Sequence, residues 1–368
     1  MILNILIYTI SSLYLLFFLT MLYGLVKMIL QKKYEGPPQK ISVIVAARNE
    51  ESNIETLIKA ILNQDYANTD YELVIADDRS EDETGDIIQL YCDLYPDNVK
   101  KVRINEQKVD LIGKKNALTE AIKVAKYDIL VFTDADCTPD SEWLLRMNAA
   151  FSTKVDFVAG YSPLILENKL NQGVKNLERA FFFGIAAGSF GIKYPITVTG
   201  RNMAYRKSLF NKVNGFSGIG HIRSGDDDLM LLKMKHYIRE YAYLLDKTGV
   251  VPSKDRNAIK SQANLETRRY SKFKYHPLYV QSISLFAFIY YLMFFTSTIL
   301  TIMGIMPVSL FFKMIVLKII SELLLITPYL ELINKKRLLN YYPILLVYYT
   351  IHFLVFAFKG TFGSYRWK

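Results

Sequence analysis

Polar clusters rich in acidic residues follow three apolar runs that are expected to form β-strands. They lie at 48–51 after the run 41–47, at 77–80 after the run 71–76, and at 134–136 after the run 127–133. Ligands of parallel α/β sheets bind outside the carboxyl ends of the strands, so three such clusters predict one shared site. Each cluster alone is also typical of a helix start, because Asp and Ser cap helices. Their coincidence at three strand ends favours a binding site.

The pair Asp134 and Asp136 is separated by one residue, which places both carboxylates on the same side of an extended segment. Carboxylates are hard ligands, and Mg²⁺ or Mn²⁺ is usually held by one or two of them together with substrate phosphates. The motif therefore predicts Mg²⁺ or Mn²⁺ as a cofactor that neutralises a diphosphate leaving group. The sequence has no Gly-x-x-x-x-Gly-Lys-Ser/Thr loop and no Gly-x-Gly-x-x-Gly motif, which argues against a P-loop enzyme or an ordinary dinucleotide-binding protein.

The elements that must position these residues alternate between strand and helix. Strands are expected at 41–47, 71–76, 100–104 and 127–133, and helices at 53–63, from about 82, and at 114–125. This alternation predicts an α/β domain with a mostly parallel, mixed sheet. A further strand is expected at 196–199 and a further helix at 229–236.

The charge distribution separates this domain from its flanks. The 368-residue chain has a formal net charge of +10, yet residues 1–30 contain one charged side chain and residues 278–368 contain eight basic and two acidic ones. The middle is therefore close to neutral, which favours membrane association of the flanks and no binding of nucleic acid. The two cysteines, Cys92 and Cys137, cannot form a disulfide framework and fit a reducing compartment.

Four apolar runs are long enough to be membrane segments, at 2–30, 278–303, 308–330 and 341–358. The first run lacks a preceding basic region and is too long for a signal peptide, so we interpret it as an anchor. Basic residues directly after it place the domain in the cytoplasm, at the inner (plasma) membrane. The third run contains Lys318 and Glu322, which are spaced to pair on one helix face. It either spans within a bundle or lies along the interface.

The charges near the last runs disagree about topology. The loop 335–337 is basic and favours a spanning third run, whereas the basic tail 359–368 favours the opposite side. We expect four crossings, because the loop lies close to two spans. The expected organisation is an anchor at 1–30, a catalytic domain at 38–256, an amphipathic interfacial segment at 257–277, transmembrane helices at 278–358 and the tail.

Over residues 38–275 the sequence resembles membrane-anchored inverting glycosyltransferases of family 2, which have the nucleotide-sugar-binding fold called GT-A. The motifs that carry this resemblance are Val43–Glu51, Asp77–Asp82, Gly113–Leu118, Thr133–Cys137, Thr199–Arg206, Ser224–Leu229 and Glu266–Tyr270. The last motif departs from the family, which often has Gln where this chain has Glu266 and Trp where it has Tyr270.

The resemblance implies a role for each matching residue. On the donor side, Glu50 and Asp78 hold the base and ribose, Ala47 and Arg48 belong to the same donor region, Lys114 and Arg269 bind the diphosphate, Asp136 ligates the metal, and Asp134 lies near the sugar or nucleotide and the metal. On the acceptor side, Arg201 and Asn202 lie near the transferred sugar and the acceptor, and Tyr270 offers a stacking face. The catalytic base is Asp227, with Asp226 as the alternative because the acidic run leaves a one-residue ambiguity. The alternative interpretation of this run is an acidic cap on the helix that follows.

The predicted function is metal-dependent transfer of a sugar, with inversion, from a UDP-sugar to a membrane-associated lipid or polysaccharide acceptor of the cell envelope. One alternative is a polyprenyl-phosphate glycosyltransferase, whose phosphate acceptor needs little help from a base. Another is a non-catalytic nucleotide-sugar sensor or scaffold in the membrane, for which the departures at Glu266 and Tyr270 are the support.

Overall fold

The computed structural model describes residues 2–165, 170–254, 266–267 and 270–362. The chain forms two compact units. The sheet unit comprises Lys27–Ile165 and Lys193–Lys254, and the helical unit comprises Met1–Val26, Leu166–Ile192 and Asp255–Lys368. Most of the predicted interfacial segment 257–277 and most of the basic tail lie outside the described residues, and the predicted domain limits stay a prediction.

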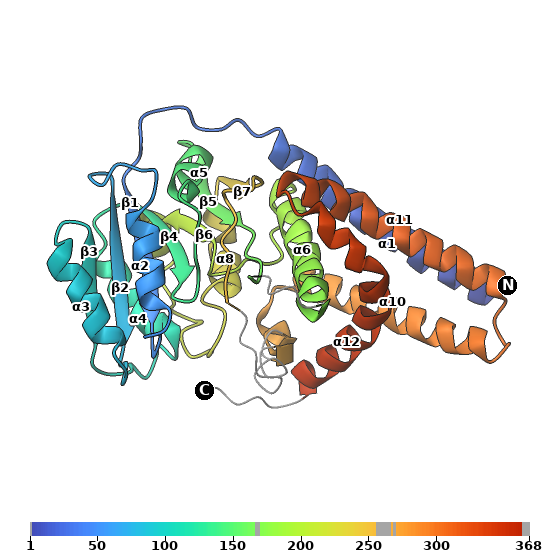
Figure 1. Ribbon diagram of the computed structural model, residues 1–368. Helices are drawn as coiled ribbons and strands as arrows, with labels where there is room; N and C mark the ends of the chain where they lie inside the picture. The colour runs from blue at the N-terminus through green and yellow to red at the C-terminus, as the bar shows by residue number, and fades with distance from the viewer. Residues whose placement is uncertain (1, 166–169, 255–265, 268–269, 363–368) are drawn as a thin grey trace. The chain divides into compact units, whose positions relative to one another are not determined.

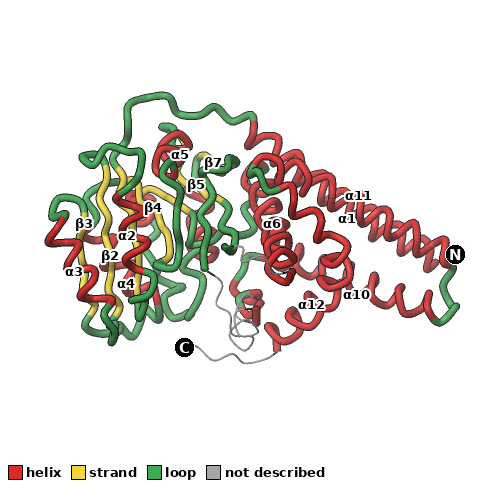
Figure 2. Tube along the Cα trace, viewed as in Figure 1, coloured by secondary structure: helices red, strands yellow, loops and turns green. Residues whose placement is uncertain are grey.

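The sheet unit is built on one seven-stranded mixed sheet in the order β3-β2-β1-β4-β6-β5-β7 (Figures 1 and 2). The strands are β1 Ile41–Ala47, β2 Tyr71–Asp78, β3 Val99–Ile104, β4 Ile129–Asp134, β5 Val155–Gly160, β6 Met203–Arg206 and β7 Glu240–Leu244. Strands β1 to β4 pair in parallel, β6 runs antiparallel to both β4 and β5, and β5 pairs in parallel with β7. The mostly parallel sheet predicted from the sequence is therefore confirmed.

Helices cover both faces of this sheet. Helices α2 (Ile54–Leu62), α3 (Thr84–Leu94) and α5 (Trp143–Ala150) share a core with the odd-numbered residues of β1, while α4 (Lys114–Val124) packs on β1 and β2 from the other face. In α2 the buried positions are Ile54, Leu57, Ile58 and Ile61, which is the spacing of a single apolar stripe. Two short helices, α7 (Lys207–Lys212) and α8 (Asp228–Met234), complete the unit.

The pairing register explains why the polar clusters meet. Ala47 lies opposite Asp77 on β2, and Ala46 lies opposite Asp134 on β4. Because these strands are parallel, their carboxyl ends are level at one edge of the sheet. The convergence predicted for the three clusters is confirmed by this register.

One predicted strand is wrong. Residues 196–199 form no strand. The strand in this region is β6, which starts at Met203, after the predicted strand was expected to end. Residues 199–202 instead form a turn in which the Asn202 amide donates to the Thr199 carbonyl at 3.3 Å. Gly200 and Arg201 therefore precede a strand, where the sequence analysis placed them after one.

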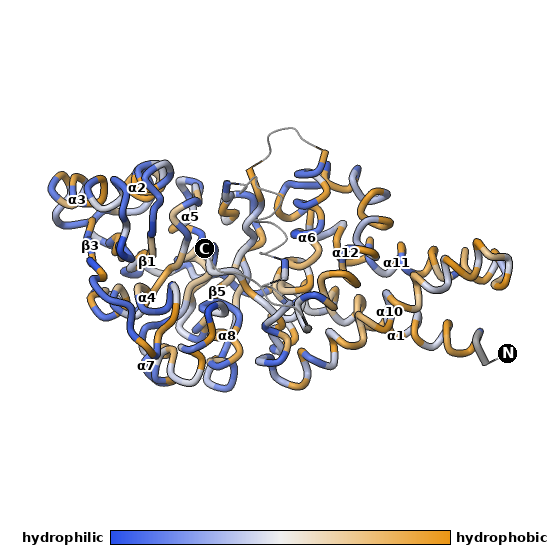
Figure 3. The backbone as a smooth tube through the Cα atoms, turned by 90° about the horizontal axis from the view of Figure 1, so that it is seen from below, coloured by the Kyte–Doolittle hydropathy of each residue, from blue (hydrophilic) through white to orange (hydrophobic). Residues whose placement is uncertain are grey.

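The helical unit contains five long helices among the described residues. They are α1 (Ile2–Ile29), α6 (Leu170–Gly191), α10 (Leu278–Ile302), α11 (Val308–Leu332) and α12 (Tyr342–Phe362). Among the described residues, three segments are long and apolar enough to cross a membrane: Asn4–Ile29, Leu278–Ile302 and Lys336–Thr361. Hydrophobic residues predominate along α1 and α10 (Figure 3). This confirms the N-terminal segment and two of the three C-terminal segments.

Helix α11 is long enough to span a membrane, but its apolar sequence contains the charged residues Lys313, Lys318 and Glu322. Lys318 and Glu322 are both buried and form the predicted ion pair on one helix face. Glu322 also accepts hydrogen bonds from the hydroxyls of Tyr14 and Tyr342, each at 2.6 Å. The pair thus joins α11 to α1 and α12. The four crossings and the side of the C-terminus stay predictions.

Helix α6 lies within the sequence range of the predicted catalytic domain, yet it groups with the helical unit. It contacts α1 at glycines: a Cβ on Gly24 would lie 1.9 Å from the Gly188 carbonyl oxygen, and one on Gly191 would lie 1.9 Å from the Gly24 carbonyl oxygen. Only glycine allows two helix backbones to approach this closely. Gly188 and Gly191, three positions apart on one helix face, are the sequence signal for this contact.

Candidate active site

The carboxylates of the Asp-Ala-Asp motif face the same cation. Asp134 is the last residue of β4, and Asp136 is two positions beyond it and buried. The Arg201 guanidinium donates from Nε to Asp134 Oδ2 at 3.2 Å, and its Nη2 lies 3.8 Å from Asp136 Oδ2. The two acids therefore point toward one small volume. They do so across a turn and not along an extended segment as predicted, because β4 ends at Asp134 and the Cys137 amide donates to the Asp134 carbonyl at 3.1 Å.

Lys114 supplies a second positive charge to the same acids. Its ammonium pairs with Asp134 and lies 4.0 Å from Asp226 Oδ2. Burial alone lowers the pKa of Lys114, but attraction by Asp134 and Asp226 more than offsets it, so the net pKa is raised. The same balance, with Asp136 and Asp134 as the partners, raises the pKa of Arg201. Both side chains stay cationic at neutral pH.

This donor set fits a divalent ion. Asp134 and Asp136 offer hard oxygen ligands that converge, and the cations that now neutralise them are the groups that bind phosphate oxygens in other proteins. The site therefore suits a metal and a diphosphate together.

The motif Gly113–Leu118 has two functions in the structure. Gly113 adopts φ +69°, which starts α4 and directs Lys114 toward Asp134. The next residue, Lys115, is buried and donates to the carbonyls of Ile222 and Ser224. It therefore braces the loop that leads to Asp226. The sequence analysis gave Lys115 no role, although its place beside Lys114 was the available signal.

The acidic run 226–228 divides between two environments. Asp226 faces Lys114, as described above. Asp227 is the N-cap of α8: its Oδ1 accepts from the Asp228 amide at 2.8 Å, and its Oδ2 accepts from the Gly200 amide at 3.2 Å. Gly225 makes the turn possible with φ +84°. The helix-cap interpretation is thus correct for Asp227, and it fixes the orientation of that carboxylate.

The ends of β1 and β2 form the other side of the site. Asp77 and Asp78 are buried, and Arg79, with φ +58°, donates from Nε to Asp78 Oδ1 at 2.9 Å. The Glu50 amide donates to Thr84 Oγ1 at 2.8 Å, and its carboxylate accepts from Asn53 at 2.7 Å. Ala47 is buried at the end of β1 and Arg48, directly after it, is exposed. These residues lie at the level of the strand ends, where the base and ribose are predicted to bind.

Arg201 and Asn202, predicted to lie near the transferred sugar and the acceptor, have different surroundings in the structure. Arg201 contacts the carboxylates of Asp134 and Asp136. Asn202 is fully buried: its amide donates to the carbonyls of Tyr161 and Gly249, and its Oδ1 accepts from the Trp143 indole at 3.0 Å. Its side chain thus joins three segments of the sheet unit and is not open to an acceptor.

The last predicted motif belongs to the helical unit. Tyr270 packs edge-to-face on Phe353 of α12, with ring centroids 5.7 Å apart. Arg269 lies outside the described residues. The contribution of this motif to diphosphate or acceptor binding stays a prediction.

One protein-family model matches a large part of the chain. The family model described as Glycosyl transferase family 2 matches residues 42–213, which include the Asp-Ala-Asp motif, β1 from Ser42 onward and all of β2 to β6. These residues are a glycosyltransferase family 2 domain. The fold is the GT-A fold that the resemblance implied, with the carboxylates at the predicted strand ends.

Individual relatives agree with this family 2 domain. The chain is 28% identical over 204 residues to a probable glycosyltransferase, YdaM, of Bacillus subtilis, covering 54% of this chain and 48% of that protein. It is 35% identical over 121 residues to a beta-monoglucosyldiacylglycerol synthase of Nostoc sp., covering 33% of this chain and 25% of that protein. The matches thus span about half or less of these relatives.

A solved structure resembles both units of the chain. It is a mannosyltransferase from Pyrobaculum calidifontis in complex with GDP-Man and Mn²⁺, which is 16% identical in sequence. The superposition covers 93% of this chain and 98% of that chain with a TM-score of 0.58. At 16% identity this similarity supports the assignment of the fold alone, over a range that includes the family 2 domain.

Proposed function

We propose that the protein is a membrane-anchored glycosyltransferase that moves a sugar, with inversion, from a nucleotide-sugar donor to a lipid or polysaccharide acceptor. The observation that carries the proposal is the convergence of Asp134, Asp136, Lys114 and Arg201 at level strand ends of a family 2 domain. Two carboxylates and two permanent cations are the groups needed to hold a metal and a diphosphate.

The donor is held from both ends in this proposal. Glu50 and Asp78, at the ends of β1 and β2, contact the base and ribose of a UDP-sugar, beside Ala47 and Arg48. Lys114 and Arg201 contact the diphosphate, because both are cationic at neutral pH and already lie against anionic oxygens. When bound by Asp134 and Asp136, Mg²⁺ or Mn²⁺ adds positive charge where the leaving diphosphate develops negative charge. The Mn²⁺ in the mannosyltransferase complex supports this assignment.

Asp227 is the better candidate for the base. An inverting transfer requires the base and the leaving group on opposite sides of the anomeric carbon. Asp226 lies near Lys114, on the side expected for the diphosphate, whereas Asp227 is held by the Gly200 and Asp228 amides. These two hydrogen bonds hold the Asp227 carboxylate in one orientation, and a fixed orientation is what a general base requires.

The reaction is then a single displacement. Asp227 accepts the proton of an acceptor hydroxyl as its oxygen bonds to the anomeric carbon. The bond from that carbon to the diphosphate oxygen breaks on the opposite face, and the electron pair leaves with the nucleoside diphosphate. Lys114 and Arg201 stabilise the charge that this oxygen gains. The step needs no covalent glycosyl-enzyme.

The apolar helices suggest an acceptor in or near the membrane. Three described helices are suited to span a bilayer, and basic residues after the first one favour a cytoplasmic sheet unit at the inner membrane. Soluble nucleotide sugars and lipid acceptors are both accessible there. The Nostoc relative is named a beta-monoglucosyldiacylglycerol synthase, and this name supports a lipid acceptor and a role in the cell envelope.

The test compares two neighbouring variants, Asp227→Asn and Asp226→Asn, in full-length protein. We expect Asp227→Asn to fold, to bind the nucleoside diphosphate, and to lose about 10²–10⁴-fold in kcat, the usual contribution of a general base. Asp226→Asn should act mainly on donor affinity through Lys114. Full turnover by Asp227→Asn would refute the assignment of the base.

The polyprenyl-phosphate alternative interprets the same two Asp227 hydrogen bonds as a helix cap alone, with no part in catalysis. A phosphate acceptor is already ionised and needs no base. Under this alternative Asp227→Asn stays active on polyprenyl phosphate, while Asp136→Asn does not. Lipid extracts incubated with donor and analysed by mass spectrometry distinguish a phosphate-linked product from a hydroxyl-linked one.

A further inference from the structure

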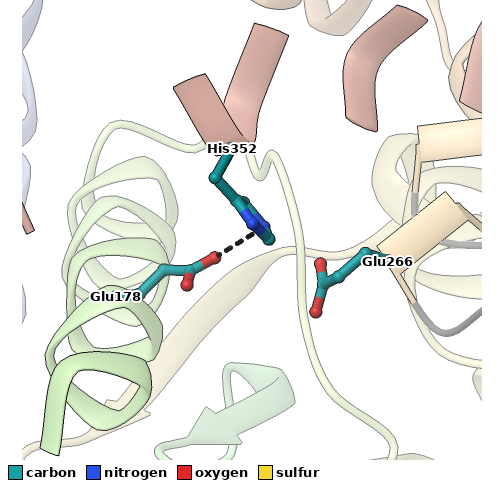
Figure 4. A group of neighbouring side chains, drawn as sticks. All are labelled: Glu178, Glu266 and His352. Atoms are coloured by element: carbon teal, nitrogen blue, oxygen red, sulfur yellow. Dashed lines mark ion pairs between the residues drawn. The ribbon is translucent and has the colours of Figure 1, made fainter. Parts of the chain in front are cut away.

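Three side chains that bind metals in other proteins meet in the helical unit. They are Glu178 on α6, Glu266 in the last family motif, and His352 on α12 (Figure 4). One ligand atom from each lies within 4.8 Å of the other two, and Glu178 Oε1 is 3.8 Å from His352 Nε2. These residues are distinct from the strand-end acids of the sheet unit. We propose that they bind a second divalent cation, of the Zn²⁺ type.

The orientation of His352 supports a ligand role. Its Nδ1 is 2.7 Å from the Tyr348 hydroxyl, one turn earlier on α12. With the proton on Nδ1 and donated to that hydroxyl, Nε2 presents a lone pair toward the two carboxylates. The ring also packs against Phe356, with centroids 4.6 Å apart. Metal-binding histidines usually have such a hydrogen bond at the second nitrogen, which fixes tautomer and orientation.

The charges in the cluster also favour a cation. The side chains of Glu178 and His352 are only 8% and 9% exposed and Glu266 is partly buried, so solvent screens the two carboxylates from each other only in part. A divalent ion neutralises both. Zinc bonds to imidazole nitrogen and carboxylate oxygen are about 2.0–2.2 Å long, so rotation of the flexible Glu side chains is sufficient to close the cluster on one ion.

The choice of ion follows from the ligand types. An imidazole with two carboxylates suits Zn²⁺ and similar transition ions better than Mg²⁺, which prefers oxygen ligands. Three protein ligands leave a fourth position open for water or an oxygen of a substrate. The strand-end site, with carboxylates alone, has the opposite preference. The two sites are therefore expected to differ in metal selectivity.

The proposal also explains the departure of Glu266 from the family. Where the related enzymes often have Gln, this chain has a carboxylate, and it lies next to Glu178 and His352. A neutral amide is a poor ligand for a transition ion, whereas a carboxylate completes a three-ligand set. The inference does not depend on the proposed glycosyl transfer.

The experiment measures Zn²⁺ binding by isothermal titration calorimetry to metal-stripped, full-length protein in detergent, with the absorption spectrum of bound Co²⁺ as a second readout. We expect wild type to bind one Zn²⁺ that Asp136→Asn retains, and Glu178→Gln and His352→Gln each to weaken that binding at least 10-fold. Glu331→Gln is the matched control, because Glu331 is an exposed carboxylate of the same unit, paired with Lys336. It should bind as wild type does.

Glu266→Gln, which restores the common family residue, keeps the test valid if a buried variant fails to fold. Its expected effect is also a loss of at least 10-fold in Zn²⁺ affinity, with an unchanged elution volume on size exclusion. If wild type binds no Zn²⁺, or if Glu266→Gln and His352→Gln bind it normally, the proposal is overturned and the cluster is an ion pair between protonated His352 and the glutamates. Neither outcome requires transfer activity, so it is separate from any failure of the proposed function.

Discussion

Acids are paired with cations in both units of the molecule, but in opposite ways. In the sheet unit Asp134 is 29% exposed and shares Lys114 and Arg201 with its neighbours. In the helical unit Glu322 is 6% exposed and has Lys318 as its cation, with two tyrosine hydroxyls as further donors. In the first arrangement Lys114 and Arg201 can change partner from the acids to a bound ligand. In the second, Lys318 and Glu322 are buried against each other and are not accessible to a ligand.

The surroundings of Lys318 reinforce the contrast. Its ammonium lies 4.8 Å from the ring centre of Tyr291 and 5.6 Å from that of Tyr14, in the range of cation–π attraction. A buried ion pair with every neighbour engaged is costly to break, because the remaining charge is left without compensation. An ionic cluster is therefore suited to chemistry when its charged partners are shared and accessible to solvent.

The largest expected effect is on activity and follows from loss of a strand-end carboxylate. Asp136→Asn should lower sugar transfer by about 10²-fold or more, because charge stabilisation of the leaving group is lost. A chelator added to wild type should have a comparable effect. The melting temperature should change little, and Glu81→Gln, at an exposed position of the same edge, should be fully active. A large drop in stability with normal transfer would reverse the assignment of the two clusters.

The second-largest expected effect is on stability and concerns the buried ion pair of Lys318 and Glu322. Lys318→Met leaves Glu322 buried without its cation, which should destabilise the protein by about 3–5 kcal/mol. Adding Glu322→Gln removes that charge and keeps an oxygen acceptor for Tyr14 and Tyr342, so the double variant should recover much of the loss. Thermal unfolding in detergent measures both. Lys313→Met, at an exposed position of the same helix, is the control and should melt near wild type.

A smaller effect is expected where α1 meets α6. In Gly188→Ala the new Cβ would lie 2.3 Å from the Met21 carbonyl oxygen, so the helices must separate, at a cost of about 1–3 kcal/mol. In Gly184→Ala the Cβ meets Tyr329 at an ordinary 3.5 Å. That variant should be neutral or gain up to about 1 kcal/mol from helix propensity. Equal melting temperatures for the two variants would contradict the close contact.

The smallest effect concerns the two thiols of the sheet unit. Burial raises the pKa of Cys137, beside the Asp-Ala-Asp motif, to about 12, whereas Cys92 is only partly buried. Iodoacetamide at pH 8.5 should therefore modify Cys92 first, as peptide mass spectrometry can show. Because the folded state holds the Cys137 proton more tightly than the unfolded state, stability should fall as pH rises from about 9 towards 12. Rapid alkylation of Cys137 in folded protein would show that the motif is more open than the structure indicates.

Much of the sheet unit was predictable because its signals are local. Strands β1 to β4 are continuous apolar runs, and the acids follow them directly, so the edge where Asp134 and Asp136 meet follows from parallel pairing. The ion pair of Lys318 with Glu322 was predictable for the same reason, since both lie on one helix. Local patterns thus identified both ionic clusters.

Features set by long-range contacts were not predictable in this way. Asn202 joins Trp143, Tyr161 and Gly249, which are 41 to 59 positions away, and nothing near it in the sequence signals this. The contact of Arg201 with Asp134 spans 67 positions and likewise has no local signal. The same holds for α6, which belongs to the helical unit because it packs against the distant helices α11 and α12.

The position of α6 in the sequence has a practical consequence. The chain enters the helical unit at its start, leaves it for β1 to β5, returns for α6, leaves again for β6 and β7, and ends there. Neither unit is therefore a continuous stretch, and trimming both ends cannot yield a water-soluble enzyme. Such a protein would still contain α6, whose glycine surface would then lack α1 to pack against. A soluble version therefore also requires replacing α6 with a short polar linker between residues 165 and 193.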